Sequence, residues 1–219
     1  MIHSPTTSAG IIKMGAGQLN LTGANTYTGT TTVNEGTLIL EGSIQGTADV
    51  NLNAGTLGGT GIIAGILNVG DGIGSQDAAL APGVADISTL YTSNSINFAS
   101  DAVFSLQINT NSTPETDLLL TTGAISLGLG VATLNVENLG TAMLTNGQTF
   151  TFLSGSSITG TFAGLSDGTV FAVGSNHFEI NYTETIVELI AVPEPASAAS
   201  LLGGLGMLLG LQRFRRRAV

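Results

Sequence analysis

A short unit repeats at a constant spacing along the first third of this chain. Each unit carries a glycine followed two positions later by a leucine, and a further glycine recurs at the same spacing. The aligned positions are Gly17-Gln18-Leu19, Gly36-Thr37-Leu38 and Gly55-Thr56-Leu57, together with Gly23, Gly42 and Gly61. A fourth unit, at 78–83, comes later than this spacing requires, which places an insertion in the loop 71–76. A unit this short is incompatible with helical-hairpin repeats and propeller blades.

Apolar residues alternate with polar ones inside the unit, as at Leu38 and Leu40. Alternation with period two predicts short strands, and the glycines and asparagines between them predict corners. Two or three short strands per unit form one coil of a parallel β-solenoid, in which stacked coils satisfy each other's backbone groups. We therefore predict an all-β solenoid over 11–144 after a disordered start at 1–10, with Thr31 aligned to Val50 and Val69.

Residues 145–191 contain more phenylalanine and tyrosine than the repeats. A solenoid needs a cap that closes its open end, because the last coil otherwise leaves strand edges unpaired. Turn residues at Asp167-Gly168 and at Gly174-Ser175-Asn176 suit antiparallel hairpins. We therefore predict a C-terminal antiparallel β cap over 145–191.

The charge of the body is strongly negative. Before residue 192, Lys13 is the only lysine or arginine, against fourteen carboxylates. Such a surface repels phosphate backbones, so we expect no nucleic-acid partner. The chain has no cysteine, which excludes disulfides and thiolate–zinc sites and suits an envelope or exterior location.

The C-terminal segment, 192–219, differs from the body. A hinge at Val192-Pro193-Glu194-Pro195 precedes an uncharged run at 196–211, and four of the five basic residues follow that run: Arg213, Arg215, Arg216 and Arg217. As a helix the run would measure about 24 Å, short of the roughly 30 Å hydrocarbon core, with the arginines anchoring a cytoplasmic end. We predict a single transmembrane helix that holds a membrane-anchored precursor with its body outside.

The repeats resemble the autotransporter-associated β-strand repeat. The resemblance is carried by 15–29, with its core Gly23-Ala24-Asn25-Thr26-Tyr27-Thr28-Gly29, and by 31–38, and it extends over about 11–90. It implies a right-handed parallel β-helix of the kind found in secreted passenger domains. It implies no catalytic chemistry.

The tail resembles the PEP-CTERM protein-sorting signal, with Pro193, Glu194 and Pro195 as the motif, then the apolar run and the basic stop. The resemblance implies a bacterial substrate of an exosortase, a membrane protease. Cleavage near the motif would free the body for the cell surface or an exopolysaccharide matrix. An ordinary tail anchor is the alternative interpretation.

No catalytic, cofactor or metal site emerges from the sequence. His3 and His177 are isolated, and we place His177 in a turn. The loop 71–77 offers two carboxylates, whereas calcium usually takes six to eight oxygens, so an inserted loop is the simpler interpretation. We predict a non-enzymatic surface or matrix structural protein. The alternatives are a glycan-binding adhesin module and a fragment of a larger enzyme acting on neutral polysaccharide, which needs a carboxylate pair.

The first residues lack an export signal. Residues 1–17 contain only the short apolar pair Ile11-Ile12, whereas a secretory signal has a basic start and an apolar run of about 7–15 residues. The repeats also begin almost at once. We expect that residue 1 is not the true start of the protein, which the coding frame upstream of Met1 would decide.

Overall fold

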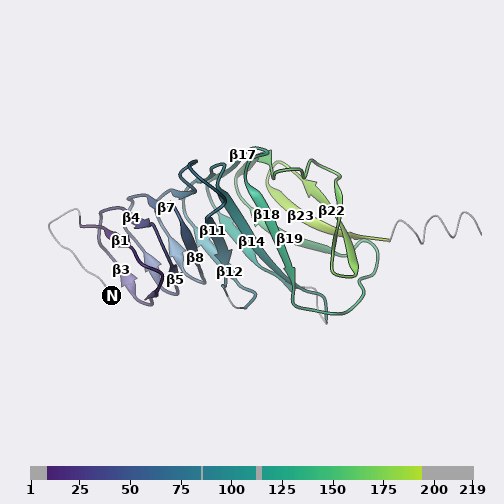
Figure 1. Ribbon diagram of the computed structural model, residues 1–219, viewed down its shortest axis with the longest axis horizontal. Coiled ribbons are helices and arrows are strands. Elements are labelled where there is room, and N and C mark those ends of the chain that lie inside the picture. Colours follow the sequence, from purple (N-terminus) through teal and green to yellow (C-terminus); the bar gives the residue numbers. More distant parts are fainter. Residues whose placement is uncertain (1–8, 85, 112–114, 194–219) are drawn as a thin grey trace, which may run out of the picture.

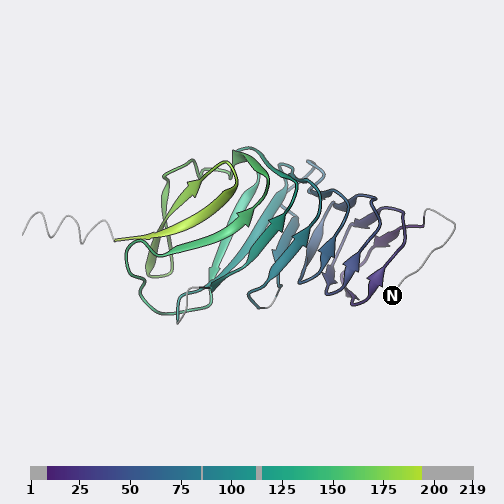
Figure 2. The same ribbon diagram turned by 180° about the vertical axis from the view of Figure 1, so that it is seen from behind.

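The computed structural model describes residues 9–84, 86–111 and 115–193. The regular secondary structure of these residues consists of β-strands alone. The strands stack coil upon coil along the long axis, with the N-terminal coils at the narrow end and the C-terminal strands at the wide end (Figure 1). The view from behind shows the same stack (Figure 2). The predicted all-β fold with stacked parallel strands is confirmed.

Three sheets run along the stack, and the coils contribute one strand to each in turn. The first sheet contains β1 (Ile11–Lys13), β4 (Thr31–Val33), β7 (Val50–Leu52), β10 (Leu67–Val69), β13 (Ile96–Phe98), β17 (Ala124–Leu129) and β20 (Ser157–Thr161). The second contains β2 (Gln18–Leu21), β5 (Thr37–Leu40), β8 (Gly55–Gly59), β11 (Ala78–Pro82), β14 (Ala102–Asn109), β15 (Glu115–Thr116) and β18 (Thr133–Asn138). The third contains β3 (Ala24–Asn25), β6 (Ser43–Ile44), β9 (Ile62–Ile63), β12 (Thr89–Thr92), β16 (Leu118–Thr121), β19 (Thr149–Ser154), β21 (Val170–Val173), β22 (Asn176–Tyr182) and β23 (Ile186–Val192).

The coils lengthen along the stack. In the second sheet Gln18 pairs with Thr37, and Thr37 pairs with Thr56, so these coils have the length that the repeat predicts. In the first sheet Leu67 pairs with Ile96, and Ile96 pairs with Ile125, so these later coils are longer than the early ones. In the coil that begins with β10 the added residues lie mainly in the loops at 70–77 and 83–88, whereas the next coil lengthens mainly through β14 and β15.

One predicted alignment is wrong. Thr31 pairs with Val50 as expected, but Val50 pairs with Leu67, and Val69 lies opposite Leu52. This coil is two positions shorter than the repeat. Because side chains alternate with period two, a loss of two positions keeps every apolar side chain inside, whereas a loss of one would turn the strand inside out.

The core is a set of apolar rows that run from coil to coil. Leu38, Leu57 and Leu80 follow one another in the second sheet and are fully buried. Each such side chain stabilises the fold by about 1.5–3 kcal/mol relative to an exposed one. Where the coils widen, the rows change to phenylalanine, and four rings fill the larger interior with centroids about 6 Å apart: Phe98, Phe104, Phe152 and Phe162.

The strands change direction near the C-terminal end. β23 pairs antiparallel with β19 and β22, and β21 and β22 form a hairpin that turns at Gly174 and Ser175. Parallel pairing nevertheless continues to β20, beyond residue 144. The boundary between solenoid and cap, and the other predicted domain limits, stay predictions.

Among the described residues, no helix is long and apolar enough to cross a membrane. The predicted transmembrane helix at 196–211 lies outside the described residues, as does nearly all of the start at 1–10 that we expected to be disordered.

Candidate functional site

Of the predicted sorting residues, the structure describes Pro193 alone. Pro193 follows β23 and is exposed, and it is the last residue described. Glu194, Pro195 and the basic stop, Arg213, Arg215, Arg216 and Arg217, lie outside the described residues. Their roles stay predictions.

Of the two histidines, the structure describes His177. His3 lies outside the described residues. His177 is the second residue of β22, so its predicted place in a turn is wrong. Its Nδ1 atom is buried and has no hydrogen-bond partner, and its side chain lines a hollow of about 370 Å³ with Met143 and Pro193. No carboxylate of the described residues lines this hollow, so nothing there would form a pair with the imidazole.

The acidic loop 71–77 is held by hydrogen bonds to a buried carboxylate. Asp101 is 2% exposed, and its two oxygens accept the backbone N–H groups of Asp71 at 2.9 Å and Gly72 at 2.7 Å. Asp71 itself accepts the N–H of Ile73 at 2.9 Å. In the described part of the chain no three His, Cys, Asp or Glu side chains gather as metal ligands would. The contacts therefore fit an inserted loop.

An asparagine ladder runs along the outer face of the first sheet. It consists of Asn51, Asn68 and Asn97, one from each of three successive coils. The amide of Asn68 donates to Asn51 at 2.8 Å, and that of Asn97 donates to Asn68 at 2.9 Å. Because an amide side chain can both donate and accept, the ladder ties neighbouring coils together and still offers polar atoms to solvent.

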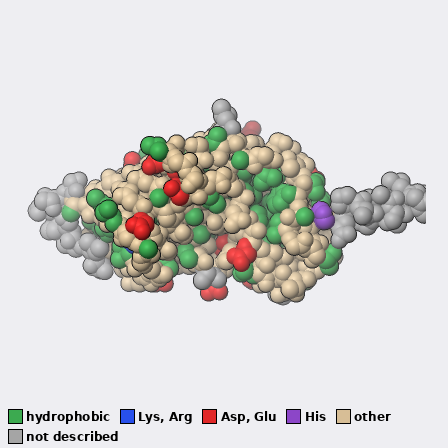
Figure 3. All heavy atoms as spheres, viewed as in Figure 1, with side chains coloured by type: hydrophobic (Ala, Val, Ile, Leu, Met, Phe, Trp, Pro, Cys, Tyr) green, Lys and Arg blue, Asp and Glu red, His purple; other side chains and the backbone are tan. Residues whose placement is uncertain are grey.

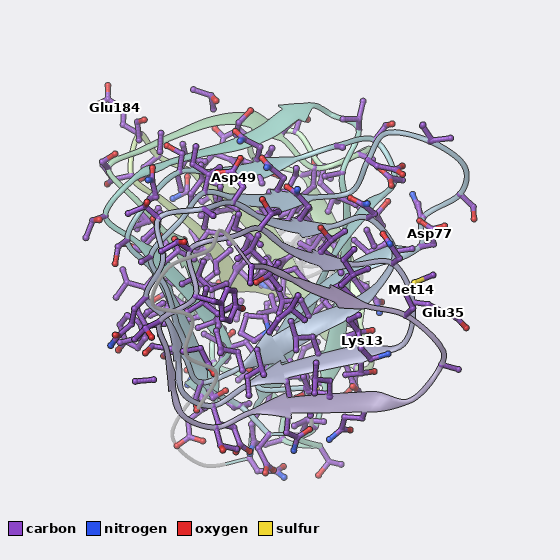
Figure 4. The ribbon with its side chains drawn as sticks, turned by 90° about the vertical axis from the view of Figure 1, so that its left-hand side faces the viewer. Lys13, Met14, Glu35, Asp49, Asp77 and Glu184 are labelled. Carbon is purple, nitrogen blue, oxygen red and sulfur yellow. The ribbon has the colours of Figure 1, made fainter. Side chains whose placement is uncertain are left out.

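Lys13 closes a corner of the first coil. Its side chain occupies the inward position that Val33 and Leu52 fill in later coils, and it is 7% exposed. The ammonium donates to the carbonyl oxygens of Met14 at 3.1 Å, of Gly15, and of Glu35 at 2.9 Å. Figure 4 shows Lys13, Met14 and Glu35 together at one corner of the end-on view.

At that corner the ammonium of Lys13 lies inside the coil and the carboxylate of Glu35 lies outside it. The carboxylate of Glu35 accepts the N–H of Gly15 at 3.1 Å. The ammonium thus satisfies three carbonyls that would otherwise lie at an open edge of the stack. The sequence carried a signal for this role, because Lys13 is a lone cation at a position that the alternation assigns to the core.

The second sheet carries a groove on its outer face, with a volume of about 300 Å³. Ala79 and Ala81 line it together with polar side chains from neighbouring coils: Thr37, Thr56, Ser105, Gln107, Asn135 and Glu137. Asp117 lies at one wall and is fully buried. The groove therefore brings together residues from successive coils, on the strands β5, β8, β11, β14 and β18.

Asp117 links two segments beside the groove through hydrogen bonds. Its oxygens accept the backbone N–H groups of Ser88 at 2.9 Å and Gln107 at 2.8 Å. Burial raises the pKa of Asp117 to about 6, and the two N–H groups oppose that rise because they stabilise the ionised form. Sequence reasoning missed this residue, although an aspartate directly before the apolar run 118–120 was a usable signal.

Charge elsewhere is spread out. Acidic side chains are scattered over the face drawn in Figure 3 and do not gather in one patch. Within the described residues, Lys13 is the one lysine or arginine, and its charge is turned inward. An anionic ligand would therefore meet repulsion at the groove.

Residues 11–40 match the family model of the passenger-associated-transport-repeat. The matched segment runs from β1 to the end of β5. This repeat is the autotransporter-associated β-strand repeat that the sequence resembled, so the resemblance is confirmed for 11–40, and its extension to about residue 90 stays a prediction. No curated protein matches the chain. The resemblance of the tail to the PEP-CTERM signal stays a prediction.

Proposed function

We propose that this chain is a non-enzymatic structural protein of a bacterial cell surface or extracellular matrix. The observation that carries the proposal is the match of 11–40 to the passenger-associated-transport-repeat, because that repeat is associated with the exported passenger domains of autotransporters. A surface location also suits the composition. The chain lacks cysteine, and its described surface is acidic and rich in threonine and asparagine.

The geometry favours a scaffold. The asparagine ladder and the inner leucine rows repeat the same contacts from coil to coil, which gives a stiff, extended body with nearest-neighbour stabilisation. The buried carboxylates serve the backbone. Asp101 and Asp117 each accept two backbone N–H groups, which is a structural role for both carboxylates.

We propose further that the tail directs sorting. Pro193, Glu194 and Pro195 would be read by an exosortase while the apolar run 196–211 holds the precursor in the membrane. Arg213 and the arginines of 215–217 would keep the end of the chain in the cytoplasm. The exposed position of Pro193 after β23 is compatible with access to the hinge.

The sorting proposal is tested in a bacterium that produces an exosortase and the full chain behind an export signal. The measurements are surface labelling of intact cells and the mass of the released body. Replacing Pro193, Glu194 and Pro195 by alanine should leave the full-length precursor in the membrane. The control is Glu184→Ala, an exposed glutamate in the loop before β23, which should be processed normally. Normal processing of the motif variant would refute the sorting role, and an intracellular body would refute the surface role.

A further inference from the structure

The peptide group between Asn94 and Ser95 is held by side chains at both of its ends. Its carbonyl oxygen accepts hydrogen bonds from the hydroxyl groups of Thr92 at 3.1 Å and of Thr121 at 2.6 Å. Its N–H group donates to the side-chain oxygen of Asn94 itself at 2.8 Å. This peptide lies at the corner between β12 and β13, where the Asn94 side chain is exposed. The amide of Asn94 therefore lies against the backbone nitrogen with which it can react.

The side-chain carbon Cγ of Asn94 lies close to the Ser95 nitrogen. The C=O bond of the amide is about 1.2 Å long, so a nitrogen that is 2.8 Å from Oδ1 is at most about 4 Å from Cγ. Reacting atoms in a near-attack arrangement are about 3–3.5 Å apart. The orientation of the amide is fixed, because a flipped amide would turn its N–H₂ group toward the N–H group of Ser95. A small rotation of the side chain thus brings the nitrogen and Cγ within reach of each other.

The two hydroxyl donors are themselves held in place. Thr92 is 4% exposed and Thr121 is 5% exposed, and they lie on the paired strands β12 and β16. The Oγ1 atom of Thr121 also accepts the N–H of Gly123 at 2.9 Å, which leaves its hydroxyl hydrogen for the Asn94 carbonyl. A Cβ at Gly123 would lie 2.4 Å from the Asn94 carbonyl carbon, so Gly123 packs directly against this peptide. The donors therefore stay directed at the Asn94 carbonyl oxygen.

These donors favour the loss of the Ser95 amide proton. When a peptide nitrogen loses its proton, much of the negative charge moves onto the carbonyl oxygen of the same peptide group. Fixed hydrogen-bond donors that point at developing negative charge stabilise it. The hydroxyls of Thr92 and Thr121 supply this stabilisation, so the Ser95 nitrogen is a better nucleophile than a backbone nitrogen whose carbonyl faces water.

We propose that Asn94 modifies itself by forming a cyclic imide with the Ser95 nitrogen. Hydroxide takes the N–H proton, the nitrogen forms a bond to Cγ of Asn94, and the bond from Cγ to Nδ2 breaks. The leaving nitrogen takes a proton from water and departs as ammonia, which regenerates hydroxide. Water then opens the imide at either of its carbonyls and leaves an aspartate or an isoaspartate at this position.

Either product changes the corner. Both add a carboxylate to a body that is already acidic, and isoaspartate also lengthens the main chain by one carbon atom. The lengthened chain displaces the carbonyl that Thr92 and Thr121 hold, so the contact between these coils weakens. On a cell surface the modified protein would accumulate with age. That consequence rests on the proposed location, whereas the reaction itself does not.

The sequence alone favours a different asparagine. Asn146 precedes Gly147, and a glycine nitrogen is the least shielded because glycine has no side chain. In the folded protein, however, the N–H of Gly147 donates to the carbonyl oxygen of Ala191 at 2.8 Å, which holds that nitrogen and its proton in the backbone hydrogen bonding. The structure therefore ranks Asn94 above Asn146, which is the reverse of the order expected for the unfolded chain.

The test is incubation of the full chain at neutral and mildly alkaline pH, both folded and in urea, followed by peptide mapping with mass spectrometry and isoaspartate detection. In the folded protein Asn94 should convert about tenfold faster than in urea, which is the effect of one hydrogen bond to a developing charge. The rate should rise with pH, because hydroxide takes the proton. Asn146 should convert faster than Asn94 in urea and more slowly in the folded protein. Conversion of Asn94 that is no faster in the folded protein than in urea would overturn the proposal.

Variants of the donors test the cause of the reactivity. Thr121→Val removes one donor and should slow the conversion about tenfold, and Thr92→Val should do the same with the other donor. Thr121→Ser keeps the hydroxyl and should convert at the rate of the wild type. The matched control is Thr122→Val, which removes an exposed hydroxyl that donates to the Ser93 carbonyl at 3.1 Å in the same corner, and its rate should not change.

Circular dichroism shows which variants are folded, and the rates of those variants are compared. A valine variant that converts as fast as the wild type, or faster, would show that the hydroxyl does not drive the reaction and would overturn the proposal. The inference concerns one corner of the body, so it can fail while the surface location and the sorting of the tail are upheld, and the reverse also holds.

Discussion

The carboxylate of Asp101 should stabilise this fold more than any exposed acid of the loop 71–77, which Asp101 holds. Asp101 is buried, and each of its oxygens accepts one backbone N–H group, from Asp71 and from Gly72. Replacement by asparagine keeps one oxygen and turns the other into an N–H₂ group, which then faces a backbone N–H group of the loop. One charge-assisted hydrogen bond is lost, at about 1.5–3 kcal/mol, and a buried N–H group is left unsatisfied. We expect Asp101→Asn to lower the free energy of unfolding by about 2–4 kcal/mol.

The matched control is Asp77→Asn, which makes the same change of charge at an exposed residue of the loop that Asp101 holds. No side-chain hydrogen bond holds Asp77 in the described structure, so this variant should unfold within about 0.5 kcal/mol of the wild type. Urea denaturation followed by circular dichroism gives both values, because the chain contains no tryptophan to report by fluorescence.

A local measurement tests the same mechanism independently. Amide hydrogen exchange of the segment 70–77 should be slow in the wild type and in Asp77→Asn, and faster in Asp101→Asn. Equal urea midpoints for the two variants, with unchanged exchange at Gly72, would show that the carboxylate does not hold this loop.

Three further predictions concern the corners of the coils. Lys13→Met leaves three corner carbonyls without their donor and should destabilise the protein by about 1–3 kcal/mol in urea denaturation, whereas exposed Met14→Leu should not. Gly164→Ala adds a Cβ in open space at a φ of 70°, so we expect it to lower the free energy of unfolding by about 1–2 kcal/mol. Gly36→Ala has a similar φ of 73° but places its Cβ 2.5 Å from two carbonyl oxygens, so it should lower the free energy of unfolding by more. The pKa of Asp117 is about 6 in the folded protein and 3.8 in the unfolded chain, so ionisation of Asp117 opposes folding. When the pH is lowered from about 7.5 to about 5, the urea midpoint should therefore rise, and it should rise by more in the wild type than in Asp117→Asn.

The regular part of the fold could be predicted from the sequence because its physics is local and periodic. Alternation of period two fixes which side chains face inward, and the spacing of Gly17, Gly36 and Gly55 fixes the length of the early coils. The register of Val50 with Leu67 could not be found in this way. A coil shortened by two positions keeps the same inward pattern, so the alternation is identical for both alignments.

The groove could not be predicted from sequence spacing, because much of its lining comes from the longer coils that follow the regular repeats. The long coils leave corner segments without neighbours in register, and their backbone N–H groups need other acceptors. Asp101 and Asp117 supply these acceptors to segments of the preceding coil, and each stands directly before an apolar strand, β14 or β16. Asp117 thereby ties β14 at Gln107 to the chain at Ser88, and Gln107 and Asp117 both line the groove. An irregular coil thus relies on buried carboxylates where the regular ladder of backbone hydrogen bonds is interrupted.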